Sequence, residues 1–511
     1  MFIIIDQLRA DCLHGALGRH VNLPHLRDLM GDAVTFANHH SATSPCGPSR
    51  ASILTGQYAM NHGSVRNGTP LPHDLPNLAT EARKAGYEPL LYGYTDTSMD
   101  PRMFAADDPA MRSYEQVMPG FTEVVEMRLE ESWPWRAHLA SKGYDVPPFP
   151  EIFRPNGERP DDPAFYRAED SDTAFLTDAT IADLTVRPKG WFAHLTYIRP
   201  HSPLVAPAPY NKMYNPASLL GPDRPCGRKD AARVHPFNGP AAEYRSIASH
   251  VEGFPDLDDD DDTARLLRAI YLGLATEVDY HIGRVLNFLR ETGQYDDTLI
   301  VVTADHGEML GDHHIWGKMS YHDACYHTPL IIRDPERSAH FGRVFEAPTS
   351  SVDVAPTILD LIGQNAPETM DGYSLKPFLE GHIPSGWRDY SFSELDFGNP
   401  VVPTLWQTKL GLDADDANMA VLRSDTHTLV HFNGGLCPLL FDRKTGGEAT
   451  NIAQDAGSEK ILLEMSRAML NHRMTHAGGR FARTLITQDG VVTVPSEGPD
   501  GPPEMRLAQV S

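Results

Sequence analysis

Residues 46–50 read Cys-Gly-Pro-Ser-Arg, a short segment in which a cysteine stands just before a helical stretch at residues 51–55. Pro48 suits the first turn of a helix, where a missing amide proton has no cost. The side chain of Cys46 would then face free amide groups at a helix amino terminus, which favour an anionic ligand. A lone cysteine is more often a small buried hydrophobic residue, so the segment alone leaves both interpretations open.

Polar side chains that suit a divalent metal follow two apolar runs of the sequence. Asp6 and Gln7 come directly after the first run, and Asp305 and His306 come directly after the other. Two carboxylates, an amide oxygen and an imidazole together form a plausible set of ligands for one metal ion. Aspartates also cap helices and histidines also satisfy buried carbonyl groups, so the metal site is a hypothesis at this point.

The apolar runs that carry these side chains predict buried parallel strands at residues 2–5, 191–198 and 298–303. Prolines after the second run force a loop, which places His201 just past the end of a strand. In open α/β sheets, ligands collect beyond the carboxyl ends of the strands. We therefore expect the polar side chains to meet at one edge of the sheet.

Helical spacing alternates with these strands. It covers residues 75–85 before a further strand at 89–92, and a long helix begins after the acidic run at 258–262 and stops before Gly293. The aspartates complement the dipole of that helix, so we interpret them as a solvated cap rather than a calcium site. The alternation predicts an α/β fold with a large, mostly parallel sheet sandwiched by helices.

The composition changes after about residue 380. Short strands are expected at residues 419–422 and 439–442, and a helix at about 460–473, which together predict a smaller α+β domain. The residues near the end are rich in Ser, Gly, Pro and Asp, as in a flexible tail or an arm that lies on a neighbouring subunit. The expected organisation is a catalytic domain (1–380), a smaller α+β domain (381–482) and an extended tail (483–511).

Composition excludes several classes of protein. The 511 residues carry a formal net charge of −25, which argues against nucleic acid and anionic membranes as partners. A short apolar start without basic residues, and the lack of a run of about 20 apolar residues, predict a cytoplasmic protein outside the membrane. Five scattered cysteines fit neither a disulfide framework nor a structural zinc site.

Longer blocks of the sequence resemble the sulfatase family of the alkaline phosphatase superfamily. The resemblance is carried in order by residues 46–56, 61–63, 303–313 and 351–361. It implies that a formylglycine-generating enzyme oxidises Cys46 to formylglycine, which hydrates to a geminal diol. One hydroxyl of the diol attacks sulfur or phosphorus while the alcohol departs, and deprotonation of the other hydroxyl then expels sulfate and restores the aldehyde.

The same resemblance, carried over residue by residue, implies roles for the other polar side chains. It implies that the metal ligands are Asp6, Gln7, Asp305 and His306. Arg50 would orient the diol, and Lys318 and His201 would hold the ester oxygens and assist departure of the leaving group. Asn67 and Tyr94 are candidates for hydrogen bonds to the substrate. On spacing alone, Lys318 would be a surface lysine and His201 a loop histidine.

Two departures from the common arylsulfatase pattern bear on the metal and on the ester. Gln7 stands where many sulfatases have a second aspartate, and residues 93–96 read Gly-Tyr-Thr-Asp instead of Gly-Lys-Trp-His. Both features resemble the phosphonate monoester hydrolase and phosphodiesterase branch. A neutral amide and an imidazole in the ligand set favour Mn²⁺, with Ca²⁺ as the alternative. A carboxylate at Asp96, where that branch has a neutral hydroxyl residue, would disfavour extra charge on the substrate.

We therefore expect a hydrolase of aryl sulfates with side activities toward phosphonate monoesters and phosphodiesters, because all three present a singly charged tetrahedral centre. One alternative is an enzyme that is primarily a phosphonate monoester hydrolase or phosphodiesterase, and another is a metal-binding relative without catalysis. A two-metal phosphatase or mutase lacks support, since no second set of carboxylates and histidines has suitable spacing. Related enzymes form dimers or tetramers, so the resemblance implies a homodimer or homotetramer.

Overall fold

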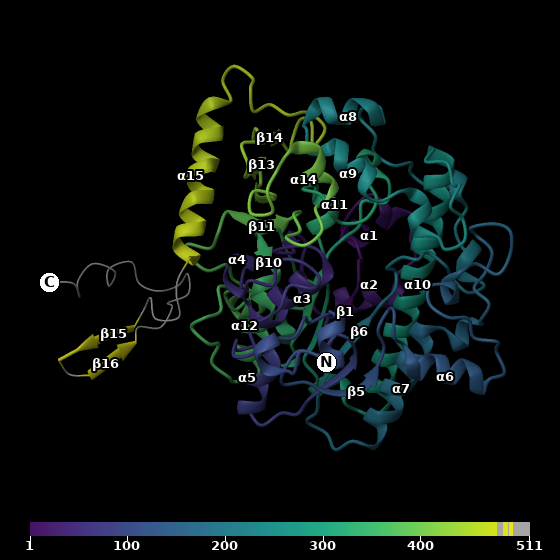
Figure 1. Cartoon of the computed structure of the whole chain (residues 1–511). Helices are drawn as coiled ribbons and strands as arrows, with labels where there is room; N and C mark the ends of the chain where they lie inside the picture. Colours follow the sequence, from purple (N-terminus) through teal and green to yellow (C-terminus); the bar gives the residue numbers. More distant parts are fainter. Residues whose placement is uncertain (478–483, 489, 494–511) are drawn as a thin grey trace.

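The computed structural model describes residues 1–477, 484–488 and 490–493 (Figure 1). Its largest sheet has eight strands in the order β5-β4-β6-β1-β7-β8-β2-β9. These strands are β1 (Phe2–Ile5), β2 (Val34–Phe36), β4 (Pro89–Gly93), β5 (Thr122–Glu126), β6 (Phe192–Tyr197), β7 (Ile300–Ala304), β8 (Leu330–Arg333) and β9 (Val344–Phe345). Strand β1 is parallel to β6 and β7, whereas β8 is antiparallel to β7 and β2. The large, mostly parallel sheet is therefore confirmed.

Helices cover both faces of this sheet. Alternate residues of a strand point to opposite faces, and Ile3 and Ile5 of β1 belong to one core cluster whereas Phe2 and Ile4 belong to another. The first cluster includes residues of α2 (Pro24–Gly31), α7 (Asp172–Val186) and α10 (Asp261–Glu291). The second includes residues of α3 (Cys46–Thr55), α5 (Leu78–Lys84) and α12 (Val354–Leu361). In Figure 1, α3, α5 and α12 lie on one side of β1 and β6, and α7 and α10 lie on the other.

Side-chain caps determine where two of the expected helices begin. Oδ1 of Asp260 accepts a hydrogen bond of 2.7 Å from the amide of Thr263, so the acidic run caps α10 as predicted. Helix α5 begins at Leu78, three residues later than the apolar spacing indicates. The cause is Asn77, whose Oδ1 accepts a hydrogen bond of 2.9 Å from the amide of Ala79.

An antiparallel sheet with the order β11-β12-β13-β14 follows in the chain. Its strands are β11 (Tyr390–Asp396), β12 (Asn418–Ser424), β13 (His427–Phe432) and β14 (Leu439–Asp442). One core cluster contains Tyr326 together with Val421 of this sheet. Another contains Tyr58, Phe392 and Met465 of α15 (Glu459–His476). The smaller α+β unit is confirmed, while its boundary at residue 380 stays a prediction.

The tail predicted for residues 483–511 falls mostly outside the described residues. Its described part forms the hairpin of β15 (Thr484–Thr487) and β16 (Gly490–Thr493). The remaining described helices are α1 (Asp11–His14), α4 (Ala59–His62), α6 (Trp133–Ser141), α8 (Arg228–Val234), α9 (Asn238–Tyr244), α11 (Asp323–Tyr326), α13 (Lys376–Leu379) and α14 (Leu405–Leu410). The short strands β3 (His39–His40) and β10 (Thr349–Ser350) pair with each other. Among the described helices, none combines the length and the apolar character that a membrane span requires.

Candidate active site

Three neighbouring strands end at the same edge of the large sheet. In the parallel register, Ile5 of β1 stands beside Tyr197 of β6 and beside Ala304 of β7. The polar segments after these strands, which contain Asp6 and Asp305 among others, are therefore neighbours in space. The polar side chains therefore meet at the carboxyl edge of the sheet, as expected.

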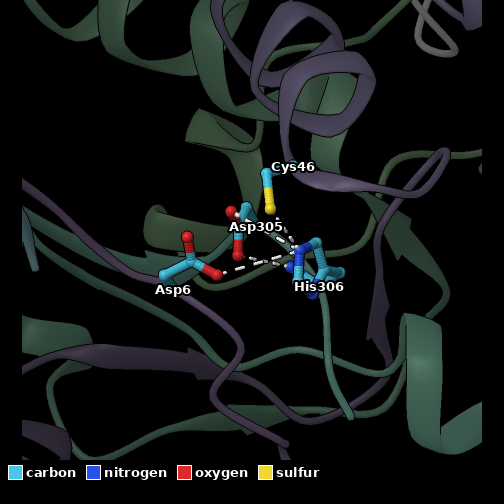
Figure 2. Close-up of side chains that lie close together, drawn as sticks. All are labelled: Asp6, Cys46, Asp305 and His306. Carbon is cyan, nitrogen blue, oxygen red and sulfur yellow. Dashed lines mark hydrogen bonds and ion pairs between the residues drawn. The ribbon is translucent and has the colours of Figure 1, made fainter. Parts of the chain in front are cut away.

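Figure 2 shows Asp6, Cys46, Asp305 and His306 pointing toward one another. One potential ligand atom from each lies within 4.8 Å of the others, and all four residues are buried. Oδ1 of Asp6 has no hydrogen-bond partner among the described residues. A buried carboxylate oxygen without a partner is costly unless a cation meets it. The donor set and this unsatisfied oxygen fit a bound divalent metal.

The imidazole of His306 is held in the form that can bind a metal. Its Nδ1 lies 2.9 Å from the carbonyl oxygen of Gly307, so Nδ1 donates and the lone pair is on Nε2. Nε2 lies 3.2 Å from Sγ of Cys46 and 3.8 Å from Oδ1 of Asp6. Burial lowers the pKa of His306 to about 3, so the ring is neutral.

Hydrogen bonds hold both the backbone and the side chain of Gln7. Its backbone has a left-handed φ of 68°, its amide donates to Oδ1 of Asp305 at 3.0 Å, and its carbonyl accepts from the hydroxyl of Tyr271 at 2.7 Å. In the side chain, Nε2 donates to Oε2 of Glu308 at 2.5 Å, and Oε1 accepts from Nζ of Lys318 at 3.1 Å. Because a carboxylate only accepts and an ammonium only donates, these partners fix which end of the amide is oxygen.

Sequence reasoning missed Glu308, although it lies two residues after His306 in one of the blocks that carry the family resemblance. The side chain is 1% exposed. Its Oε2 binds the Gln7 amide, and its Oε1 accepts from the amide of Gly317 at 2.6 Å, directly before Lys318. Glu308 therefore connects a candidate metal ligand with a candidate catalytic residue.

Arg50 joins the two carboxylates of the cluster. Its Nε donates to Oδ2 of Asp305 at 3.0 Å, and its Nη2 contacts Oδ2 of Asp6 at 3.3 Å. Nη2 also donates to the hydroxyl of Tyr94 at 2.8 Å, and that hydroxyl donates to Asp6. Nη1 donates to Oγ1 of Thr196 at 2.7 Å. Arg50 and Tyr94 thus hold the carboxylates of Asp6 and Asp305 in place, and this use of their polar groups was not apparent from the sequence.

Lys318 and His201, expected to act as a pair, are in direct contact. Nζ of Lys318 lies 2.9 Å from Nε2 of His201 and 2.9 Å from Sγ of Cys46. Nδ1 of His201 lies 2.5 Å from the carbonyl oxygen of Ser202, so Nδ1 donates there and Nε2 accepts from the lysine. Burial, together with the charge of Lys318, lowers the pKa of His201 well below its usual range. In this state the lysine is the cation and the histidine is neutral.

Helix α3 begins at Cys46 itself, five residues earlier than the helical stretch expected at 51–55. The tight packing around residue 47 favours glycine, since a Cβ atom there would lie 3.0 Å from Oδ1 of Asn67 and 3.0 Å from the carbonyl oxygen of Asp96. Oδ1 of Asn67 accepts from the amide of Gly47 at 3.0 Å. Burial, and next the charge of Asp6, raise the pKa of the Cys46 thiol well above its usual range. As an unmodified thiol, Cys46 would be a weak nucleophile.

A cleft of about 490 Å³ opens over this cluster. Its floor includes Cys46, Lys318 and His201, and its walls come from segments far apart in the chain. Aromatic rings form much of these walls: Tyr114, Phe149, Tyr244, Phe397 and Trp406. The last two belong to the part of the chain that carries the antiparallel sheet, so both units shape the space above the cluster.

Asp96 also lines the cleft. It is 6% exposed, has a left-handed φ of 49°, and its Oδ2 lies 3.9 Å from Nε of Arg50. Oδ1 has no hydrogen-bond partner among the described residues. Burial raises the pKa of this carboxyl well above its usual range, despite the nearby guanidinium. Strained backbone and an unsatisfied buried carboxyl group are features that concentrate at functional sites.

Comparisons with known proteins agree with this geometry. The sulfatase family model matches residues 1–364. The multifunctional alkaline phosphatase superfamily protein PehA of Trinickia caryophylli is 37% identical over 96% of this chain and 98% of its own length. The phosphonate monoester hydrolase SpPMH of Silicibacter pomeroyi is 59% identical, with a TM-score of 0.95 over 98% of this chain and 99% of that chain. The phosphonate monoester hydrolase of Agrobacterium radiobacter is 38% identical, with a TM-score of 0.92 over 96% and 99% of the two chains. The chain belongs to the sulfatase family of the alkaline phosphatase superfamily.

Proposed function

We propose that this protein is a metal-dependent hydrolase of sulfate esters, of the arylsulfatase type, that uses formylglycine made from Cys46 as its nucleophile and also accepts phosphonate monoesters and phosphodiesters. The main support for this proposal is that Cys46 lines a cleft in a chain of the sulfatase family. Its Sγ lies 3.2 Å from Nε2 of His306 and 2.9 Å from Nζ of Lys318. As formylglycine, residue 46 would supply a hydrated aldehyde whose hydroxyl attacks the ester.

Asp6, Gln7, Asp305 and His306 would hold the metal. When bound, the divalent ion would lower the pKa of the attacking hydroxyl and neutralise negative charge on the ester. The amide and imidazole among the ligands support Mn²⁺ over Ca²⁺, because a site of this kind has fewer carboxylates than calcium usually requires. Arg50 would keep the two carboxylates in place.

Lys318 would stabilise the ester oxygens, because its ammonium group lies in the cleft at 2.9 Å from the reacting side chain. His201 would assist departure of the leaving group. The approach of an anionic ester raises the pKa of a neighbouring imidazole, which allows Nε2 to carry a proton once substrate is present. Asn67 would donate a hydrogen bond from its side-chain NH₂ group to the ester. The hydroxyl of Tyr94, expected to bind the substrate, donates to Asp6 instead and would hold that carboxylate in place.

The order of preference among esters rests on two observations that point in different directions. In its ionised form, the Asp96 carboxyl in the cleft favours esters with little charge and supports aryl sulfates as the leading class. The second candidate is a primary phosphonate monoester hydrolase or phosphodiesterase, and the 59% identity to SpPMH supports it. Both candidates use the same nucleophile and the same singly charged transition state.

Three measurements test the proposal. The enzyme is produced with and without a formylglycine-generating enzyme, and mass spectrometry of the peptide that contains residue 46 is compared with activity. Activity should rise with the fraction of chains that carry the aldehyde. Full activity of a protein that contains only the unmodified thiol would contradict the formylglycine mechanism. Rates on 4-nitrophenyl sulfate, a phenyl phosphonate ester and a phosphodiester then rank the substrates, and elemental analysis identifies the metal. A kcat/KM for the phosphonate ester far above that for the sulfate would make the second candidate the function.

The organisation of the protein completes the proposal. We propose that the chain consists of a catalytic domain (1–380), a smaller α+β domain (381–482) and an extended tail (483–511). We also propose that it forms a homodimer or homotetramer in which the tail acts as an arm. Three apolar side chains of α15 support an interface, since Leu463, Leu470 and Met474 are 58–70% exposed and recur at helical spacing. Five free cysteines agree with a reducing, cytoplasmic location. Sedimentation of the full chain and of a chain ending at residue 482 would test the oligomer.

A further inference from the structure

The loop after β6 carries His201, and a single buried guanidinium holds its backbone. Nη1 of Arg199 donates to the carbonyl oxygen of His201 at 3.1 Å and to that of Pro203 at 2.9 Å. The side chain of Arg199 is 1% exposed. These two carbonyl groups lie on either side of Ser202, whose own carbonyl oxygen accepts from the His201 ring. Arg199 therefore ties together the two carbonyl groups that flank the residue against which the imidazole is oriented.

Arg199 is itself anchored to a helix on the sheet. Its Nε donates to Oδ2 of Asp172, the first residue of α7, at 2.9 Å, and its guanidinium lies 4.6 Å from the ring centre of Phe153. The side chain of Asp172 is 3% exposed, and its Oδ1 accepts from the amide of Thr173 at 2.8 Å. A continuous series of contacts thus leads from α7 to the loop.

Burial of such an ion pair requires a reason, because removing two charges from water costs about as much as their attraction returns. Neither Arg199 nor Asp172 lines the cleft, so a direct role in binding the ester is not available to them. The loop that Arg199 contacts carries His201, whose Nε2 lies 2.9 Å from Nζ of Lys318. An error of about 1 Å in such a contact can cost roughly 100-fold in rate.

We infer that Arg199 and Asp172 form a positioning pair that keeps the His201 imidazole beside Lys318 and in reach of the leaving group. The inference rests on the proposed function, in which His201 assists departure of the alcohol. Neither residue touches the substrate. Their effect on the reaction would pass through His201 alone.

The chain offers a matched control for the loss of a buried arginine. Arg333 is 3% exposed, its Nη1 donates to the carbonyl oxygen of Tyr295 at 2.7 Å, and its Nε donates to Oδ2 of Asp32 at 3.3 Å. Its guanidinium lies 3.9 Å from the ring centre of Tyr295. Arg333 pairs with Ile300, at the start of β7, and so lies at the edge of the sheet away from the cleft.

The test compares Arg199→Met, Asp172→Asn and Arg333→Met in the metal-loaded enzyme, on aryl sulfates whose phenols differ in pKa. A merely structural loss lowers kcat/KM equally for all phenols. Loss of leaving-group assistance lowers it most for the least acidic phenols, because these most need a proton. We expect Arg199→Met and Asp172→Asn to lower kcat/KM about 10- to 100-fold for phenyl sulfate and much less for 4-nitrophenyl sulfate. Arg199→Lys should restore part of the loss, and Arg333→Met should leave the dependence unchanged.

A double variant separates this inference from the proposed function. In the His201→Ala background, Arg199→Met should have no further effect on the dependence on the phenol, because residues that act through one group are not additive. Equal losses for all phenols, or additive losses in the double variant, would overturn the positioning pair while the proposed function stands. If His201→Ala itself leaves the dependence unchanged, the role of His201 in the proposed function fails, and the inference fails with it. If Arg199→Met does not fold, Asp172→Asn still tests the inference, because asparagine retains the shape of the aspartate side chain. The dependence of its kcat/KM on the pKa of the phenol is then the deciding measurement.

Discussion

Nζ of Lys318 lies 2.9 Å from Sγ of Cys46, although the two residues are 272 positions apart in the chain. The same ammonium group contacts His201 and Gln7. One cation thus connects the side chain that would become the nucleophile, the residue that would assist the leaving group and a candidate metal ligand. This arrangement makes the roles of the individual groups separable by substitution.

Replacement of Lys318 by Met should lower kcat/KM for 4-nitrophenyl sulfate by about 100- to 1,000-fold, the usual effect of removing one group that stabilises developing charge. The fall should appear mainly in kcat. Steady-state kinetics measure it. Lys376→Met serves as the control, because Nζ of Lys376 donates to Oδ1 of Asp360 at 3.0 Å and Lys376 does not line the cleft. A loss of kcat/KM that comes from a higher KM alone would assign Lys318 to ground-state binding.

Replacement of Cys46 by Ala should abolish the covalent step and leave the metal site in place. We expect kcat/KM to fall by at least about 1,000-fold, because no nucleophile remains at the helix terminus. Elemental analysis should still find about one metal per chain, and the melting temperature should stay close to that of the parent enzyme. Loss of metal together with unfolding would mean that Cys46 has a structural role.

Replacement of Glu308 by Gln should weaken metal binding by about 10- to 100-fold, as expected for a group that orients a ligand. The new side-chain amide could donate as well as accept, so the Gln7 side chain would no longer be fixed with its oxygen toward the metal. Titration of the metal-free protein measures the affinity without reference to activity. Glu394→Gln is a control, because that buried carboxylate instead binds the amide of Met60 at 3.0 Å. Equal affinities of all three proteins would contradict the role of Glu308.

Replacement of Asp96 by Asn should change the preference among esters. At a pH above the raised pKa of Asp96, where its carboxyl is ionised, the replacement should raise kcat/KM for doubly charged phosphate monoesters relative to sulfate by about tenfold, since one repulsive interaction near the ester is lost. The ratio of the two rates is the measurement, because it cancels any general loss of activity. An unchanged ratio would remove Asp96 from the determinants of specificity.

Replacement of Glu277 by Gln should stabilise the protein, and more so at higher pH. Burial, with a contribution from the charge of Asp172, raises the pKa of Glu277 from 4.5 to about 8. The folded protein therefore retains a proton that the unfolded chain releases above pH 4.5, and the parent protein loses stability as the pH rises toward 8. A glutamine side chain at this position has no proton to release in this range. The gain should be small at pH 4.5 and about 4 kcal/mol at pH 8.

Denaturant unfolding at several pH values measures the effect at Glu277. Glu169→Gln is the control, since the side chain of Glu169 is 67% exposed and its replacement should give the same small change at each pH. A gain for Glu277→Gln that does not grow between pH 5 and pH 8 would show that this carboxyl is ionised in the folded protein.

The strands that end at the site, β1, β6 and β7, and the candidate metal ligands were predictable from the sequence, because their signals are local. The sequence did not predict β2, β5, β8 and β9 of the same sheet. Continuous apolar runs end directly at Asp6 and at Asp305, and parallel strands bring their carboxyl ends to one edge. The segment at Cys46 carries its own helix signal, and the blocks that resemble the sulfatase family lie within the region that the family model matches.

Only the tertiary structure decided how these groups are held and what surrounds them. Arg50 contacts Asp305 across 255 positions, Glu308 contacts Gln7 across 301, and Phe397 from the second unit lines the cleft. Arg199 and Asp172 have no local pattern that links them. Such contacts depend on how whole elements pack, and a side chain in them follows no period along the chain. The sequence by itself therefore determined which chemistry is present, whereas packing determined the orientation, charge and accessibility of each group.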